Sequence, residues 1–364
     1  MPRGKTLALL LGLAIAIILA DVFIFGIGHV DTGTYLSQID GWRHFTFAVT
    51  DNPWDAFRAF KPLYGVLGLV GWFLSPVAVL LVVNAGFLFG LSVAAYLCLE
   101  RLGFSKEETL LGTFWVMTAY PALGLGFAAG TDISGWFFCA ATIAIALQAI
   151  RLESDRLLML ASLVGFLGAT GKETGVLGLV FAGTYLLLVF FDRGFRRTLR
   201  SLAALCLPFL VLEGLLLFAI SQAGLPGFFG WVTFNNALYA DIHTLKYFIG
   251  AELATFGILW LPAALGAYAL LARRIRTGAR EWKLLAALGL AALIPIAWPT
   301  FTDRILYIQW IALVPLALYG ARFLGLPRYR WILYLAPVAV SAVLLSIGGH
   351  DGLYRFAHYL ANFL

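Results

Sequence analysis

Residues 78–99 read AVLLVVNAGFLFGLSVAAYLCL, a stretch without a single charged side chain. Because about 20 consecutive apolar residues are enough for an α-helix to cross the hydrocarbon core of a bilayer, this stretch predicts a membrane-spanning helix. The whole chain of 364 residues has the same character, with 62% hydrophobic and 12% charged residues. Soluble domains carry about 25% charged residues, so the composition excludes a water-soluble enzyme fold and a disordered chain.

Apolar runs between charged breaks predict an all-α polytopic membrane protein, with about eleven transmembrane helices in a single domain that covers residues 1–364. The expected spans are 6–27, 78–99, 108–128, 132–150, 157–172, 174–191, 199–222, 248–271, 283–300, 304–321 and 331–348. Two connections are long, at 29–77 and 223–247. In the first, aromatic residues such as Trp42 and Trp54 alternate with polar groups at spacings that suit amphipathic helices lying along the membrane surface.

The basic residues favour one side of the membrane. With a cytoplasmic N-terminus, seven of the 25 Lys and Arg residues lie on the outer side and the other 18 on the cytoplasmic side. The seven outer residues are Arg43, Arg58, Lys61, Lys172, Lys246, Arg304 and Arg355. The positive-inside rule therefore predicts a cytoplasmic N-terminus and an extracytoplasmic C-terminus. The net charge of +6 is spread through membrane loops, which argues against nucleic-acid binding.

The polar groups that could carry chemistry collect on the outer side in this topology. All five histidines lie there, together with carboxylates that include Asp31, Asp132 and Glu173. The cytoplasmic connections are short and basic, so they offer no room for a catalytic site. We therefore expect any reaction to take place at the outer face.

Three outer cations stand at suggestive positions. Lys61 opens a short apolar helix, Lys172 lies in the stretch GATGKETG between two spans, and Arg304 follows Asp303 at the start of the tenth span. Because the fifth span is short, Lys172 and Glu173 are expected in a recess below the outer surface, where glycines allow irregular backbone to face a cavity. The alternative is a pair of local ion pairs, Lys172 with Glu173 and Asp303 with Arg304, that reach up to the interface.

The carboxylates have more than one interpretation. Asp31 follows the first span directly, where it could accept a proton from a hydroxyl brought to the interface, or could cap a surface helix that begins just after it. Asp132, at the start of the fourth span, has the same two interpretations. Asp21 and Glu213 lie inside spans, where a carboxylate pairs with another polar group of the bundle or marks an ion path.

In the order of these features the sequence resembles the integral-membrane glycosyltransferases of the GT-C superfamily, particularly the lipid-A aminoarabinose transferase and protein O-mannosyltransferase branch. The shared features are an Asp in the loop after the first span, a Lys-Pro helix start, an Asp that opens the fourth span, a Gly-Lys turn between two later spans, and an Arg that opens a late span containing Pro. In this sequence they are Asp31 with Tyr35, Lys61-Pro62, Asp132, Lys172, and Arg304 to Pro315.

The resemblance implies a polyprenyl-phosphate sugar as donor and a lipid, glycan or protein as acceptor, with inversion at the anomeric carbon. It implies catalytic roles for Asp31 and Asp132, and donor-phosphate contacts from Lys61, Lys172 and Arg304. The substrate cavity is expected to include Tyr35, Tyr64, Glu173, Asp303 and Tyr307. A carboxylate that takes the acceptor's proton, and cations that stabilise the charge on the leaving phosphate, are the groups that this displacement needs. Such a protein is expected in a prokaryotic inner membrane with an extracytoplasmic active site.

Two features depart from the family pattern. Asp31 is followed by Thr32, where members often have Asp-Glu, so a requirement for a divalent metal is left open. No large soluble C-terminal domain is expected within this sequence, although many relatives have one. The alternative function is a membrane transporter or lipid flippase, which would use Asp21 and Glu213 as groups inside the membrane.

Overall fold

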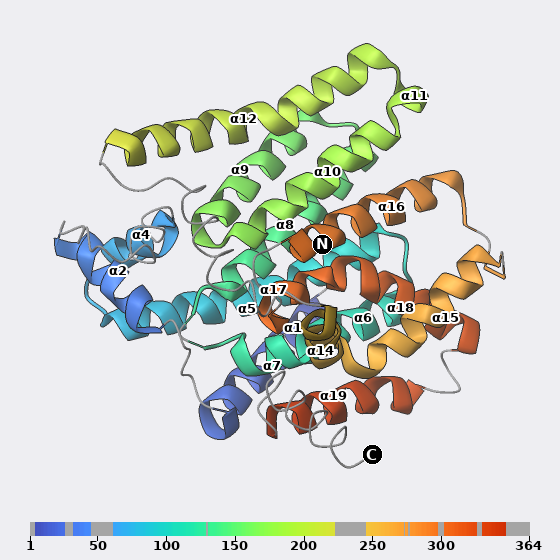
Figure 1. Ribbon diagram of the computed structural model, residues 1–364, viewed down its shortest axis with the longest axis horizontal. Helices are drawn as coiled ribbons and strands as arrows, with labels where there is room; N and C mark the ends of the chain where they lie inside the picture. The colour runs from blue at the N-terminus through green and yellow to red at the C-terminus, as the bar shows by residue number, and fades with distance from the viewer. Residues whose placement is uncertain are drawn as a thin grey trace.

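The computed structural model describes residues 4–25, 32–44, 61–128, 130–222, 245–272, 274–275, 277–297, 302–325 and 330–346, and the regular structure in these ranges is helical throughout (Figure 1). The α-helices are α1 (Gly4–Ala20), α2 (Thr32–His44), α4 (Pro62–Val70), α5 (Pro76–Arg101), α6 (Lys106–Thr118), α7 (Tyr120–Leu125), α8 (Asp132–Leu152), α9 (Asp155–Gly171), α10 (Leu177–Leu188), α11 (Phe190–Arg193), α12 (Phe195–Gln222), α14 (Leu245–Phe256), α15 (Trp260–Leu271), α16 (Ala279–Leu293), α17 (Asp303–Leu306), α18 (Trp310–Leu324) and α19 (Arg330–Ser346). A π-helical segment, η1 (Asp21–Phe25), and 3-10 segments, η2 (Glu173–Val176), η4 (Gly257–Leu259), η5 (Ile294–Ala297) and η6 (Tyr307–Gln309), extend or join them.

Six helical stretches in the described residues are long and apolar enough to cross a membrane. They are Gly4–Ile24, Pro76–Arg101, Asp132–Leu152, Phe195–Gln222, Phe248–Leu271 and Arg304–Leu324, and two shorter apolar helices are Glu173–Leu188 and Trp331–Ser346. The protein is thus an all-α polytopic membrane protein, as its composition predicts. The expected number of eleven spans stays a prediction.

The expected span at 108–128 is divided into two helices. Its start is well specified, because the Ser105 side chain accepts a hydrogen bond from the backbone N–H of Glu108 while the Glu108 carboxylate accepts one from the backbone N–H of Ser105. α6 then ends where Ala119 turns extended, and α7 begins with Pro121 in its first turn. Proline has no N–H to continue the hydrogen-bond ladder, so the helix breaks ahead of it.

α8 lies at the centre of the bundle. It packs against α5 and α9, and 78% of its most apolar 18-residue window is buried. By contrast α12 runs along one edge of the molecule beside α9 and α10 (Figure 1), with Leu207, Leu210, Leu215 and Phe218 exposed. Exposed leucines on a long apolar helix are expected where the surrounding solvent is lipid.

Close helix approach depends on two glycines at the contact of α15 with α18. A Cβ atom on Gly266 would lie 1.8 Å from the carbonyl oxygen of Leu316, and one on Gly320 would lie 1.9 Å from that of Pro262. Only glycine lets the two backbones approach this closely. This contact holds α18, and with it the short helix α17 that precedes it, against the rest of the bundle.

The two ends of α8 mark two ends of the molecule. Asp132 begins the helix and Arg151 lies in its last turn. At 1.5 Å per residue the two are about 28 Å apart along the helix axis, close to the thickness of a bilayer's hydrocarbon core. Groups near Asp132 and groups near Arg151 therefore face opposite sides of a membrane that the helix crosses.

Candidate functional site

Charged side chains from four separate segments meet at the Asp132 end of the bundle. Lys61 immediately precedes α4, and Asp132 begins α8. Lys172 joins α9 to η2, which begins at Glu173, and Arg304 lies on α17. We call these five residues the ionic cluster.

Asp132 is the meeting point of two cations. Its Oδ1 atom lies 2.9 Å from Lys172 Nζ, and its Oδ2 atom lies 3.4 Å from Arg304 Nη1. The Asp132 and Lys172 side chains are buried, whereas Arg304 keeps 23% of its side chain exposed. The carboxylate therefore holds both cations in place, and the arginine is the one that reaches toward open space.

Glu173 connects the remaining lysine to the cluster. Its Oε2 atom lies 2.5 Å from Lys61 Nζ and its Oε1 atom lies 3.7 Å from Lys172 Nζ. Burial is the largest influence on Lys61 and lowers the pKa of its ammonium to about 8, although Glu173 opposes this shift. Lys61 is therefore a buried cation whose proton is lost near neutral pH more readily than that of an exposed lysine.

The turn that carries Lys172 is built on close backbone contacts. Gly168 and Gly175 approach so closely that a Cβ atom on Gly175 would lie 2.6 Å from the backbone of Gly168. A Cβ atom on Gly135 of α8 would likewise lie 2.1 Å from Thr174 Oγ1 and 2.9 Å from Lys172 Cβ. The glycines thus allow irregular backbone to pack directly on α8, which brings Lys172 and Asp132 together.

A hydrogen-bond network supports the start of α8. The hydroxyl of Tyr64 donates to Asn84 Oδ1 at 2.9 Å. Asn84 Nδ2 in turn donates to the carbonyl oxygens of Ala128 at 2.7 Å and Gly130 at 2.9 Å. The backbone that leads into Asp132 is therefore tied to α4 and α5 through one buried amide.

Three supporting residues were not identified from the sequence. Besides Asn84, these are Gln38, whose Nε2 donates to the Lys61 carbonyl at 2.8 Å, and Trp136, whose indole N–H donates to the Arg304 carbonyl at 3.1 Å. Asn84 offered a signal, because it is the polar amide within the apolar run 78–99. Gln38 and Trp136 act on backbone carbonyls that are distant in sequence, which no local pattern specifies.

The expected cavity residues divide into two groups. Tyr35 on α2 and Tyr64 on α4 are buried beside the α5 residues Val79 and Leu80, at the same end of the molecule as the cluster. Tyr307 is directed elsewhere: its hydroxyl donates to the Val116 carbonyl of α6 at 2.6 Å. Its polar atom joins η6 to α6, and the expectation that Tyr307 lines the cavity stays a prediction.

The side chains of two expected site residues, Asp31 and Asp303, lie outside what the structure describes. Asp31 lies outside the described residues, so its position relative to Asp132 is not given. Asp303 begins α17, but only its backbone is described. The roles expected for their side chains therefore stay predictions.

The residues described at this site do not form a metal centre. No group of three or more His, Cys, Asp or Glu side chains that could hold a metal ion occurs in the described ranges. The two carboxylates of the cluster already face three cations, with Lys172 between them. The described part of this donor set therefore does not fit a divalent metal.

No family model matches the sequence, and the search of curated proteins finds no match. Among solved structures, the chain is similar in fold to the oligosaccharyltransferase of Archaeoglobus fulgidus in its apo form, with a TM-score of 0.54 and 16% identity over 96% of this chain and 55% of that chain. The same enzyme tethered to an acceptor peptide containing the NVT sequon gives a TM-score of 0.51 at 16% identity, over 96% and 54% of the two chains.

The archaeal oligosaccharyltransferase AglB from Archaeoglobus fulgidus, in complex with an inhibitory peptide and a dolichol-phosphate, has a TM-score of 0.50 at 16% identity over 94% of this chain and 54% of that chain. The chain thus spans about half the length of these oligosaccharyltransferases. At this identity the likeness is one of fold. Membership of the GT-C superfamily, and of its aminoarabinose transferase and mannosyltransferase branch, stays a prediction.

Proposed function

We propose that the protein is a membrane glycosyltransferase that moves a sugar from a polyprenyl-phosphate donor to an acceptor at the extracytoplasmic face, with inversion at the anomeric carbon. The observation that carries the proposal is the ionic cluster, in which three cations converge on two carboxylates at one end of a membrane bundle. The fold adds support, since the oligosaccharyltransferases that share it include one bound to a dolichol-phosphate.

The cost of the ionic cluster supports a functional interpretation. Taking an ion out of water costs on the order of several kcal/mol, and buried ion pairs often contribute no more stability than apolar residues of the same shape. Asp132 and Lys172 carry this cost at the end of a helix whose interior is apolar. Groups that are expensive to bury and that gather in one place are candidates for chemistry.

The charges of the side chains determine the roles that we propose for them. Lys61, Lys172 and Arg304 hold the phosphate of the donor and stabilise the negative charge that develops on it as the bond to the sugar breaks. Arg304 is placed to contact it first, since its side chain is the most exposed of the three. A carrier lipid suits a site at the end of a bundle, because its phosphate lies at headgroup depth while its chain stays in hydrocarbon.

The acidic roles are assigned to Asp31 and Asp132. Asp31 is proposed to accept the proton of the attacking acceptor group, as the resemblance implies. Asp132 is proposed to position Lys172 and Arg304 for the donor phosphate through the two ion pairs that it makes. Tyr35, Tyr64, Glu173, Asp303 and Tyr307 are proposed to line the cavity.

The proposed orientation puts the ionic cluster outside and the Arg151 end of α8 in the cytoplasm. Basic residues collect at the Arg151 end, where Arg101, Arg197, Arg200 and Lys283 lie close to the ends of their helices. An excess of Lys and Arg marks the cytoplasmic side. The inner membrane of a prokaryotic cell is the proposed location.

The transporter or flippase alternative receives less support from the structure. Asp21 is fully buried, and its Oδ2 atom accepts a hydrogen bond from the backbone N–H of Phe127 at 3.1 Å. This bond ties η1 to the segment that follows α7, which is a structural use of an interior carboxylate. Glu213 lies on α12, the helix whose apolar window is least buried.

The test is to incubate the purified full chain with a panel of polyprenyl-phosphate sugars and to follow release of the free lipid phosphate by mass spectrometry. Asp31→Asn should lower transfer by about 10²-fold or more, the usual size of a general-base contribution. Glu107→Gln, a change at an exposed carboxylate of α6, is the control for loss of charge. If no donor releases lipid phosphate, the proposed function is contradicted. If Asp31→Asn turns over at a near-normal rate, the proposed role of Asp31 is contradicted.

A further inference from the structure

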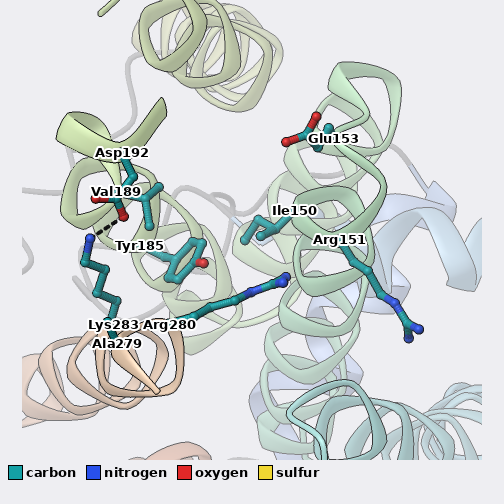
Figure 2. Close-up of a pocket in the computed structure, with 9 residues that line it drawn as sticks. All are labelled: Ile150, Arg151, Glu153, Tyr185, Val189, Asp192, Ala279, Arg280 and Lys283. Carbon is teal, nitrogen blue, oxygen red and sulfur yellow. Dashed lines mark hydrogen bonds and ion pairs between the residues drawn. The ribbon is translucent and has the colours of Figure 1, made fainter. Parts of the chain in front are cut away.

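A polar cavity lies at the opposite end of the bundle from the ionic cluster. It has a volume of about 430 Å³ and is formed by the last turn of α8, the end of α10 with α11, and the first turns of α16. Ile150, Tyr185 and Val189 form its apolar part, while Arg280 and Lys283 approach from α16 (Figure 2). We call it the basic cavity.

The acidic side chains around the basic cavity are already neutralised. Asp192 forms an ion pair with Lys283, and Glu153 forms one with Arg197. Arg280 has no acidic partner among the described residues, and Figure 2 shows its side chain reaching from α16 across the cavity toward α8. The cavity therefore presents a guanidinium group that no described carboxylate balances.

A polar atom other than the cations also lines the cavity. Tyr185 is 3% exposed, and its ring stands between α16 and α8 in Figure 2. A tyrosine hydroxyl can donate a hydrogen bond to a phosphate oxygen, and a guanidinium can donate two parallel ones. The backbone N–H groups at the N-terminus of α16 are not counted as ligands, because the carboxylate of Glu281 lies against Gly278 just before the helix.

The position of the cavity indicates what kind of anion reaches it. α8 carries Asp132 at one end and Arg151 at the other, so the cavity lies about one hydrocarbon thickness away from the ionic cluster. Trp282, next to Lys283 and Arg280 on α16, is 40% exposed. Exposed tryptophans are enriched at the level of lipid headgroups, and basic pockets between membrane helices bind anionic headgroups.

We propose that the basic cavity binds the phosphate of an anionic phospholipid from the leaflet opposite the ionic cluster. Arg280 binds the phosphate, Lys283 stays paired with Asp192 at the side of the cavity, the Tyr185 hydroxyl donates to the phosphate, and the apolar wall of Ile150 and Val189 packs against the glycerol and the first acyl carbons. This site is separate from the proposed sugar transfer, so either proposal can fail without the other.

The experiment is a native mass-spectrometry titration of the full chain in detergent, with phosphatidylglycerol and phosphatidylcholine of the same acyl chains. The wild type should retain phosphatidylglycerol in preference to phosphatidylcholine. Arg280→Gln should weaken retention of phosphatidylglycerol at least about fivefold, the size expected for one cation at a membrane surface, and Arg280→Lys should restore part of it. Tyr185→Phe should give a smaller loss.

The matched control is Arg156→Gln, which removes an exposed arginine from α9, near the same end of the bundle but outside the cavity. Equal retention of phosphatidylglycerol by the wild type, Arg280→Gln and Arg156→Gln would overturn the proposal, as would equal retention of the two lipids by the wild type. A competition arm with inorganic phosphate separates the sources of the anion. Displacement of the lipid by millimolar phosphate, together with phosphate binding that Arg280→Gln abolishes, would overturn the lipid as the ligand.

Discussion

Lys172 Nζ lies 2.9 Å from Asp132 Oδ1, although the two residues belong to different helical segments and are 40 positions apart in the sequence. The contact exists because Gly135 has no side chain to separate α8 from the turn that carries Lys172. Arg304 reaches the other oxygen of the same carboxylate. Asp132 therefore sets the positions of two of the three cations proposed to bind the donor phosphate.

Replacing Asp132 by Asn should lower sugar transfer by about 10²-fold or more, because it leaves Lys172 and Arg304 without the charge that orients them. The measurement is the rate of lipid-phosphate release by the purified variant, with thermal unfolding in detergent as the check that the fold is retained. Glu107→Gln serves as the control again. A rate close to that of the wild type would remove Asp132 from the proposed mechanism.

Substitutions of Arg304 should separate the effect of its positive charge on donor binding from the effect of its planar shape. Arg304→Lys keeps a cation but loses the planar fork that binds two phosphate oxygens, so it should raise the KM for the donor moderately, whereas Arg304→Gln should raise it about tenfold or more. Initial rates over a range of donor concentrations test this. Equal KM values for the wild type and Arg304→Gln would show that the residue does not contact the donor.

The pH dependence of donor affinity should follow the protonation of Lys61. Its pKa is lowered to about 8, so the ammonium is charged below that pH and loses its proton as the pH rises through it. Donor affinity should therefore fall above about pH 8, while Lys61→Arg, whose guanidinium stays charged, should keep its affinity to higher pH. An identical profile for Lys61→Arg and the wild type would contradict the prediction.

The same titration should not unfold the protein. An unfolded chain restores the ordinary lysine pKa of 10.5, so between about pH 8 and 10.5 the unfolded state binds more protons than the folded state. By linkage, the contribution of Lys61 to the free energy of unfolding then rises with pH in that range. A fall in donor affinity without a fall in the thermal midpoint distinguishes this titration from pH denaturation.

Asn84→Ala should destabilise the protein and disturb the start of α8. The change removes the amide that joins Tyr64 to the carbonyls of Ala128 and Gly130, and each buried group left unpaired costs about 1–3 kcal/mol. The thermal midpoint in detergent should fall clearly. Tyr64→Phe, which removes only the hydroxyl at the edge of the network, should have a smaller effect, and the reverse order would argue against the network.

Gly135→Ala should impair sugar transfer, since the added methyl group would lie 2.1 Å from Thr174 Oγ1 and would push the Lys172 turn away from Asp132. Gly86→Ala on α5 is the matched control, because a Cβ atom there meets nothing within 4 Å and alanine favours helix. Transfer rates of the two variants are compared at equal protein concentration. Equal activity in both would mean that the turn can shift without consequence.

The sequence by itself determined that the chain is helical and crosses a membrane, because composition and uninterrupted apolar runs depend only on local chemistry. It also singled out Lys61, Asp132, Lys172, Glu173 and Arg304 as candidate site residues, although for Asp132 a role as a helix cap stayed open. Breaks such as the one ahead of Pro121 lie within apolar runs, and hydropathy alone does not show them.

Only the tertiary structure decided which carboxylate faces which cation. From the sequence, local ion pairs of Lys172 with Glu173 and of Asp303 with Arg304 were one interpretation. In the structure the shortest ion pair of Lys172 is with Asp132, and Glu173 pairs more closely with Lys61. The hydrogen bond of the Tyr307 hydroxyl to the Val116 carbonyl of α6 likewise joins residues that are distant in the sequence. Side-chain partners at long sequence separation depend on how closely helices pack, and here that distance is set by glycines whose role appears only when the opposing backbone is in place.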